Sequence, residues 1–144
     1  MSIIKAFIVE DSAVIRENLV ATLEEMVPAL KVLGVAESER DATAWLDEPG
    51  HECDLVVVDV FLRQGSGILV LEHLHKVGHA AERVVLTNYA TPHVRRRCLG
   101  LGATRVFDKS GEIDALIEHC LVLADQRNPR PVPGASGAPD SRPA

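Results

Sequence analysis

The chain of 144 residues is poor in aromatic residues and in cysteine, and it has no long apolar run. Aromatic residues make up 3% of the sequence, so we expect a core of mostly aliphatic side chains. A membrane-spanning helix needs about 20 consecutive apolar residues, and no such segment is present. The three cysteines form no C-x-x-C pair and have no histidine at the spacing of zinc ligands. We therefore expect a cytoplasmic protein with reduced thiols, no membrane span and no secretory signal.

The chain also lacks an excess of positive charge. It has 15 Lys and Arg against 21 Asp and Glu, a formal net charge of −6. Nucleic-acid-binding surfaces normally show a basic excess, so we expect no nucleic-acid partner. No G-x-G-x-x-G follows the first apolar segment, which argues against a dinucleotide-binding site. A hydrophobic fraction of 47% is ordinary for a globular domain with its own core.

Five apolar segments rich in β-branched residues alternate with five segments of helical periodicity. The predicted strands cover residues 3–9, 31–36, 55–59, 83–86 and 105–107. The predicted helices begin after Ser12, at Glu39, near Ser66, at Thr91-Pro92 and at Ile113. This alternation predicts an α/β fold, a five-stranded parallel sheet in the order 2-1-3-4-5 with helices on both faces.

The composition changes abruptly near residue 126. Residues 1–125 form the predicted domain, whereas residues 126–144 are rich in Pro, Gly, Ser and Ala, with Val132 their only large apolar residue. Such a segment cannot bury enough surface to offset the entropy lost on ordering. We therefore expect residues 126–144 to form a flexible tail.

Residues 55–59, Leu-Val-Val-Val-Asp, form an apolar run that ends in a carboxylate. Such a run is typical of a strand buried on both faces, and ligands of open parallel sheets bind at the carboxyl ends of the strands. Four predicted strands deliver polar side chains there: Glu10, Asp11, Asp59, Thr87 and Lys109. Three carboxylates repel one another unless a cation joins them, and Mg²⁺ prefers oxygen ligands. With the Lys109 charge and the Thr87 hydroxyl, the set suits a phosphoryl group held on Asp59.

In their order along the chain, these residues resemble the receiver domain of two-component response regulators. The resemblance covers about residues 3–124 and also includes Ser66-Gly67, seven and eight residues past Asp59, and the Asp108-Lys109 pair. It implies the flavodoxin-like (βα)5 receiver fold, and we expect a stand-alone receiver similar to those of chemotaxis.

The resemblance implies a role for each of these residues. Asp59 accepts a phosphoryl group from a histidine kinase or a phosphotransfer protein, and Thr87 and Lys109 contact that group. Mg²⁺ is bound by the carboxylates of Glu10, Asp11 and Asp59 and by the backbone carbonyl of Phe61. A downstream protein then binds the surface of the fourth helix, fifth strand and fifth helix. The chain is expected to be no enzyme beyond catalysing its own phosphorylation and dephosphorylation.

Several positions depart from the family pattern. Arg63 and Ser110 stand where the family usually has proline, and Ser110 is a candidate cap of the last helix. Asn88 replaces a very small residue beside the phosphoryl pocket and narrows it. Val106 replaces the aromatic residue that usually moves on phosphorylation, and β-branched Val is short and stiff. We expect Tyr89 to take over that movement, and a response that spreads through the backbone of the fourth helix is the alternative.

Two alternative functions stay open. A scaffold with the receiver fold and no phosphorylation is compatible with the departures above. An aspartate-nucleophile phosphatase of the haloacid-dehalogenase type needs a second Asp two residues past the nucleophile, and position 61 is Phe. The run Arg95-Arg96-Arg97 is interpreted as a solvated helix face, with a patch for an acidic partner as the alternative.

Overall fold

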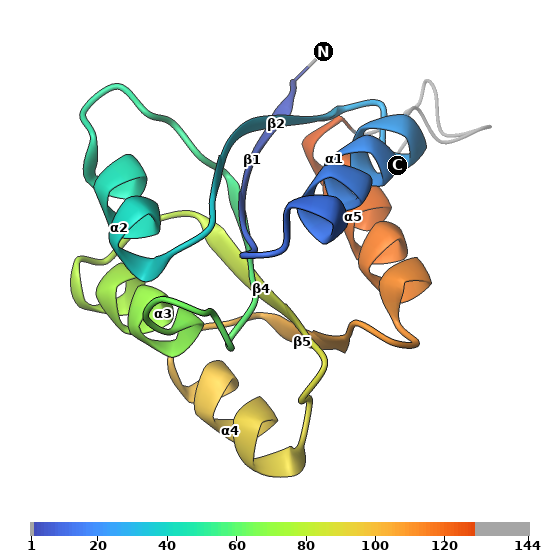
Figure 1. Cartoon of the computed structure of the whole chain (residues 1–144). Helices are drawn as coiled ribbons and strands as arrows, with labels where there is room; N and C mark the ends of the chain where they lie inside the picture. Colours follow the sequence, from blue (N-terminus) through green and yellow to red (C-terminus); the bar gives the residue numbers. More distant parts are fainter. Residues whose placement is uncertain (1, 129–144) are drawn as a thin grey trace, which may run out of the picture.

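Strands and helices alternate along residues 2–128, the part of the chain that the computed structural model describes (Figure 1). The strands are β1 (Ile4–Val9), β2 (Leu30–Ala36), β3 (Leu55–Val58), β4 (Glu82–Thr87) and β5 (Arg105–Asp108). The helices are α1 (Ala13–Met26), α2 (Glu39–Asp47), α3 (Gly67–Lys76), α4 (Pro92–Gly100) and α5 (Ile113–Arg127). The strands form one parallel sheet in the order β2-β1-β3-β4-β5. The predicted fold and strand order are confirmed.

The sheet divides the core into two layers. Helices α1 and α5 cover one face, and α2, α3 and α4 cover the other (Figure 1). Strand β3 is buried along its whole length. Its side chains alternate between the layers, with Val56 and Val58 packed on one side and Leu55 and Val57 on the other. Burial on both faces is the reason why this strand is a continuous apolar run.

Side-chain caps begin four of the five helices in the described residues. The hydroxyls of Ser12, Ser38, Ser66 and Thr91 each accept a hydrogen bond from a backbone N–H of the first turn. Helix α5 has no side-chain cap, and the residue before it is Glu112. The interpretation of Ser110 as a cap is therefore wrong. Its hydroxyl and its backbone N–H both donate to the Asp108 carboxylate, which closes a local turn instead.

The last helix extends two residues past the predicted domain boundary at 125. Its end is tied to the start of the chain: the Ser2 N–H donates to the Asn128 side chain at 2.7 Å, and the Asn128 amide donates to the Ser2 carbonyl at 2.8 Å. Arg127 also reaches Asp54, with an N–O distance of 3.3 Å. The folded unit thus includes residues 126–128, and the rest of the predicted tail lies outside the described residues. No helix within residues 2–128 has the length and apolar character needed to cross a bilayer.

Candidate functional site

The register of the sheet places Glu10 and Asp59 side by side. Val9 pairs with Val58 in the parallel ladder, so the residue after each leaves the sheet at the same edge. The backbone N–H of Asp59 donates to the Val9 carbonyl at 3.0 Å, which carries the ladder one residue further. Both carboxylates are buried, with 2% of Glu10 and 7% of Asp59 exposed. Two negative charges are therefore held close together and away from bulk water.

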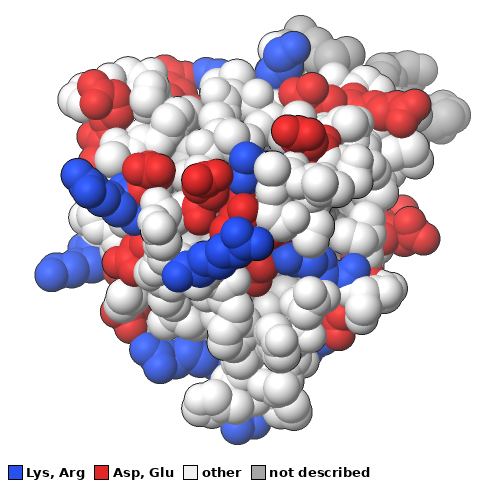
Figure 2. Space-filling model, in the orientation of Figure 1, with Lys and Arg blue, Asp and Glu red and all other residues white. Residues whose placement is uncertain are grey.

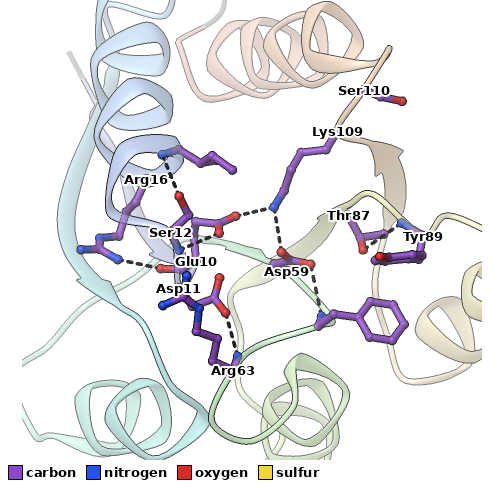
Figure 3. Close-up of polar contacts among 12 residues, drawn as sticks. Glu10, Asp11, Ser12, Arg16, Asp59, Arg63, Thr87, Tyr89, Lys109 and Ser110 are labelled. Atoms are coloured by element: carbon purple, nitrogen blue, oxygen red, sulfur yellow. Dashed lines mark hydrogen bonds and ion pairs between the residues drawn. The ribbon is translucent and has the colours of Figure 1, made fainter.

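Lys109 lies between these two carboxylates (Figure 3). Its Nζ donates to Oε1 of Glu10 at 2.6 Å and to Oδ2 of Asp59 at 2.7 Å. Burial disfavours the lysine charge, but the hydrogen bonds to Asp59 and Glu10 outweigh it, so the pKa of Lys109 is raised. The ammonium stays protonated at neutral pH and compensates the charge of the pair.

Neighbouring groups fix the two acidic residues that follow β1. The Ser12 N–H donates to Oε2 of Glu10 at 3.0 Å, and the guanidinium of Arg16 donates to the Glu10 carbonyl at 2.8 Å. The Arg63 N–H donates to Oδ2 of Asp11 at 2.7 Å. Asp11 therefore joins the loop after β1 to the loop after β3, and Arg63 takes part through its backbone.

A tight turn follows Asp59. Oδ1 of Asp59 accepts a hydrogen bond from the Phe61 N–H at 3.2 Å. Helix α3 starts so close to this turn that a Cβ on Gly67 would lie 2.0 Å from the Asp59 carbonyl oxygen. Any residue other than glycine would displace the backbone of the acceptor. The Ser66-Gly67 pair thus combines a helix cap with the space that the Asp59 turn needs.

A cavity of about 180 Å³ opens above Asp59. Its wall contains the polar residues Glu10, Asp11, Ser12, Asp59, Asn88 and Lys109 together with Ile15, Phe61 and Tyr89. The rings of Phe61 and Tyr89 meet edge to face, with centroids 4.8 Å apart, and both side chains are exposed. These two aromatic residues therefore form an outer wall of the cavity, in contact with solvent.

Thr87 is the one predicted site residue that does not face this cavity. It is fully buried, and its hydroxyl accepts a hydrogen bond from the Tyr89 N–H at 3.3 Å. Asn88, the next residue, lines the cavity in its place. In the state that the structure describes, the Thr87 hydroxyl is turned toward its own loop.

The acidic residues at this edge suit a hard cation. Among residues 2–128, no three acidic, histidine or cysteine side chains converge closely enough to form a metal cluster as they stand. Mg²⁺ needs no such cluster, because it keeps several waters and commonly binds through one or two carboxylates plus phosphate oxygens. Glu10 and Asp59 supply oxygen ligands only, and Asp11 lies beside them on the cavity wall. The chemistry of this donor set fits Mg²⁺.

Comparison with known proteins identifies the family. Residues 6–121 match the response regulator receiver domain family. The chain belongs to this family. The match confirms the resemblance to response regulator receiver domains and the receiver fold that it implied. The family acts in two-component systems.

Similar proteins contain this receiver domain within longer chains. The chain is 30% identical over 115 residues to the uncharacterized transcriptional regulatory protein YvfU of Bacillus subtilis (strain 168), covering 80% of this chain and 56% of that protein. It is 29% identical to a protein-glutamate methylesterase/protein-glutamine glutaminase of Syntrophus aciditrophicus (strain SB), covering 95% and 44%. The chain thus spans about half the length of these curated relatives.

Solved structures support the fold. One example is the signal receiver domain of a DNA-binding response regulator, merR, from Colwellia psychrerythraea 34H. It superposes with a TM-score of 0.76 at 22% identity and covers 85% of this chain and 99% of that one. At this level of identity the likeness establishes the architecture of the receiver domain.

The interpretation of Arg95-Arg96-Arg97 as a solvated face is incomplete for its first member. Arg96 and Arg97 are exposed, whereas the Arg95 side chain, 39% exposed, also bonds to backbone carbonyls. The spacing of the helix could have predicted this contact. Arg95 stands three residues before the buried Cys98 and therefore shares its helix face. Figure 2 shows basic side chains scattered among acidic ones on the face in view, without a broad basic field.

Proposed function

We propose that this receiver domain accepts a phosphoryl group on Asp59 with the help of Mg²⁺ and signals through altered contacts with other proteins. One observation carries the proposal. The Asp59 carboxylate is buried, bonded to Lys109 and next to Glu10, and it lines a cavity of about 180 Å³. A carboxylate placed for stability alone needs no cavity beside it.

The residues of the chain have distinct roles in this reaction. An Asp59 oxygen attacks the phosphorus of a phosphohistidine, an O–P bond forms, and the P–N bond to the imidazole breaks. The Lys109 ammonium already donates a hydrogen bond to Oδ2 of Asp59 at 2.7 Å, and it offsets the negative charge that arrives with the phosphoryl group. Glu10, Asp11, Asp59 and the Phe61 carbonyl would hold Mg²⁺, which would supply further charge neutralisation. The Thr87 hydroxyl turns from the Tyr89 N–H toward the phosphoryl oxygen.

Phosphorylation of Asp59 requires a donor, and signalling requires a downstream partner. We propose a histidine kinase or a phosphotransfer protein as the donor, and a downstream protein that binds the surface formed by α4, β5 and α5. The net charge of −6 gives no support to a nucleic-acid partner. Phe61 stands where a phosphatase of the aspartate-nucleophile type needs its acid, so the domain acts as an acceptor rather than as an enzyme on other substrates. The free thiols of Cys53, Cys98 and Cys120 suit a cytoplasmic location.

Phosphorylation by a small donor tests the proposal. Acetyl phosphate with Mg²⁺ should add one phosphoryl group to the wild type, seen by intact-protein mass spectrometry, and Asp59→Asn should abolish the addition. Asp54→Asn is the matched control, because Asp54 stands just before β3 as Asp59 stands just after it. Phosphorylation that persists in Asp59→Asn would place the acceptor elsewhere. A wild type that is modified neither by acetyl phosphate nor by beryllofluoride would favour the scaffold.

A further inference from the structure

Arg95 connects four segments of the fold. From α4, its Nε donates to the Ala90 carbonyl at 2.9 Å and its Nη1 donates to the Val106 carbonyl at 2.9 Å. Its Nη2 lies 3.3 Å from Oε1 of Glu112, the residue that precedes α5. All three nitrogens of the guanidinium are therefore engaged, on the loop after β4, on β5 and at the start of α5.

The partners of Arg95 lie close along the chain to the phosphorylation site. Ala90 is three residues past Thr87, and Val106 is three residues before Lys109. The Glu112 oxygen that meets Arg95 also accepts the Asp108 N–H at 2.7 Å, so it holds the residue next to Lys109. One side chain thus touches both of the segments that carry Thr87 and Lys109.

At position 106, Arg95 bonds to the backbone carbonyl of a valine. Val106 is buried and short, and it offers no ring or polar tip that could report a movement of the neighbouring loop. Its carbonyl lies on β5, which is the last strand of the sheet, and Arg95 rather than another strand bonds to it. Tyr89, the residue expected to replace the missing aromatic, lies instead at the surface, 59% exposed and against Phe61.

We propose that Arg95 couples the state of Asp59 to the surface of α4, β5 and α5, an inference that rests on the proposed phosphorylation. When the Thr87 hydroxyl turns to the phosphoryl group, it releases the Tyr89 N–H that it now holds at 3.3 Å. The loop then moves and takes the Ala90 carbonyl with it. A single planar guanidinium cannot follow that carbonyl and keep its other acceptors, because its donors form a rigid fork. The bond to Glu112, the longest of the three, is the one that opens, and α4 shifts relative to β5 and α5.

Amide NMR spectra with and without beryllofluoride and Mg²⁺ test this coupling. In the wild type, the addition should shift amides in residues 87–91 around Thr87 and in residues 106–114 of β5 and α5. In Arg95→Gln the shifts around Thr87 should remain, whereas those in residues 106–114 should fall to half or less. Arg96→Gln is the matched control, since it removes the same charge from the neighbouring exposed position, and it should respond like the wild type.

Each outcome separates the coupling from the proposed function. A wild type without any response refutes phosphorylation at Asp59 itself. An Arg95→Gln protein that responds fully in residues 106–114 refutes the coupling and leaves phosphorylation intact. Glu112→Gln removes the charge that pairs with Arg95 and keeps an amide oxygen that can accept the Asp108 N–H, so it serves if Arg95→Gln fails to fold. Its amides at 106 and 112 should lie part-way toward the beryllofluoride positions before any addition. Tyr89→Ala should keep the response in residues 106–114, and its loss there would assign the coupling to the tyrosine instead.

Discussion

Asp54 precedes β3 and Asp59 follows it, so one strand of four residues has an acidic side chain at each edge of the sheet. Oδ2 of Asp54 accepts the Lys5 N–H at 2.8 Å, and its Oδ1 lies 3.3 Å from Arg127. Asp54 therefore joins β1 to the end of α5. Asp59 is more deeply buried, shares the Lys109 cation with a second carboxylate, and lines a cavity.

The contacts at the Asp54 edge serve stability, whereas those at the Asp59 edge suit chemistry. At the Asp54 edge, polar side chains bond to backbone groups and exposed partners, an arrangement that fastens the two ends of the folded chain together. At the Asp59 edge, two buried carboxylates share one ammonium, although desolvating several charges rarely gives the most stable arrangement. Such a cluster is better explained by the phosphorylation that we propose for it than by the stability it contributes.

Removal of the shared cation should have the largest effect. In Lys109→Met, Glu10 and Asp59 lose their compensating charge in a buried site, and we expect the free energy of unfolding to fall by about 3 kcal/mol. Because Mg²⁺ can restore the missing positive charge, it should raise the melting temperature of this variant more than that of the wild type. Differential scanning fluorimetry with EDTA or Mg²⁺ measures both effects.

Lys5→Met is the control at the other edge. The Lys5 side chain is more exposed and pairs with the exposed Glu52. We expect a much smaller change, without a gain from Mg²⁺. Equal destabilisation of the two variants, with equal responses to Mg²⁺, would erase the distinction between the edges.

Shortening α5 should have an intermediate effect, on stability alone. Truncation after Asp125 removes Arg127 and Asn128, and with them the bonds to Ser2 and Asp54. At about 1 kcal/mol for each lost hydrogen bond, the melting temperature should drop by several degrees. Truncation after Asn128 should leave it unchanged, and both proteins should still be phosphorylated. An unchanged melting temperature after truncation at Asp125 would show that these contacts contribute nothing to stability.

Substitution of the two aromatic residues in the cavity wall should have the smallest effect, and that effect is on the lifetime of the phosphorylated state. Hydrolysis needs water in line with the bond from Asp59 to phosphorus, and neither Phe61 nor Tyr89 has a carboxylate or amide to orient it. Phe61→Asn combined with Tyr89→Glu should speed dephosphorylation several-fold, measured by mass spectrometry after removal of the donor. Phe61→Leu, which stays apolar, should change the rate less. Slower or unchanged hydrolysis in the double variant would refute the idea that the missing polar group limits the reaction of water.

The fold and most of the site residues could be predicted from the amino-acid sequence. The apolar run of residues 55–58 predicts a strand buried on both faces, and the alternation of strands and helices with right-handed crossovers favours the observed order of the sheet. Since all parallel strands end at the same edge, the positions of Glu10, Asp59 and Lys109 after their strands were sufficient to bring them together.

The backbone acceptors of polar side chains could not be predicted from the sequence. Arg95 lies within a run of arginines, yet its acceptors include the carbonyls of Ala90 and Val106. Asn128 likewise bonds to the backbone of Ser2, at the far end of the described chain. Every residue has a backbone carbonyl, so such acceptors leave no mark in a sequence. Which of them a side chain reaches depends on the spatial neighbours that folding provides.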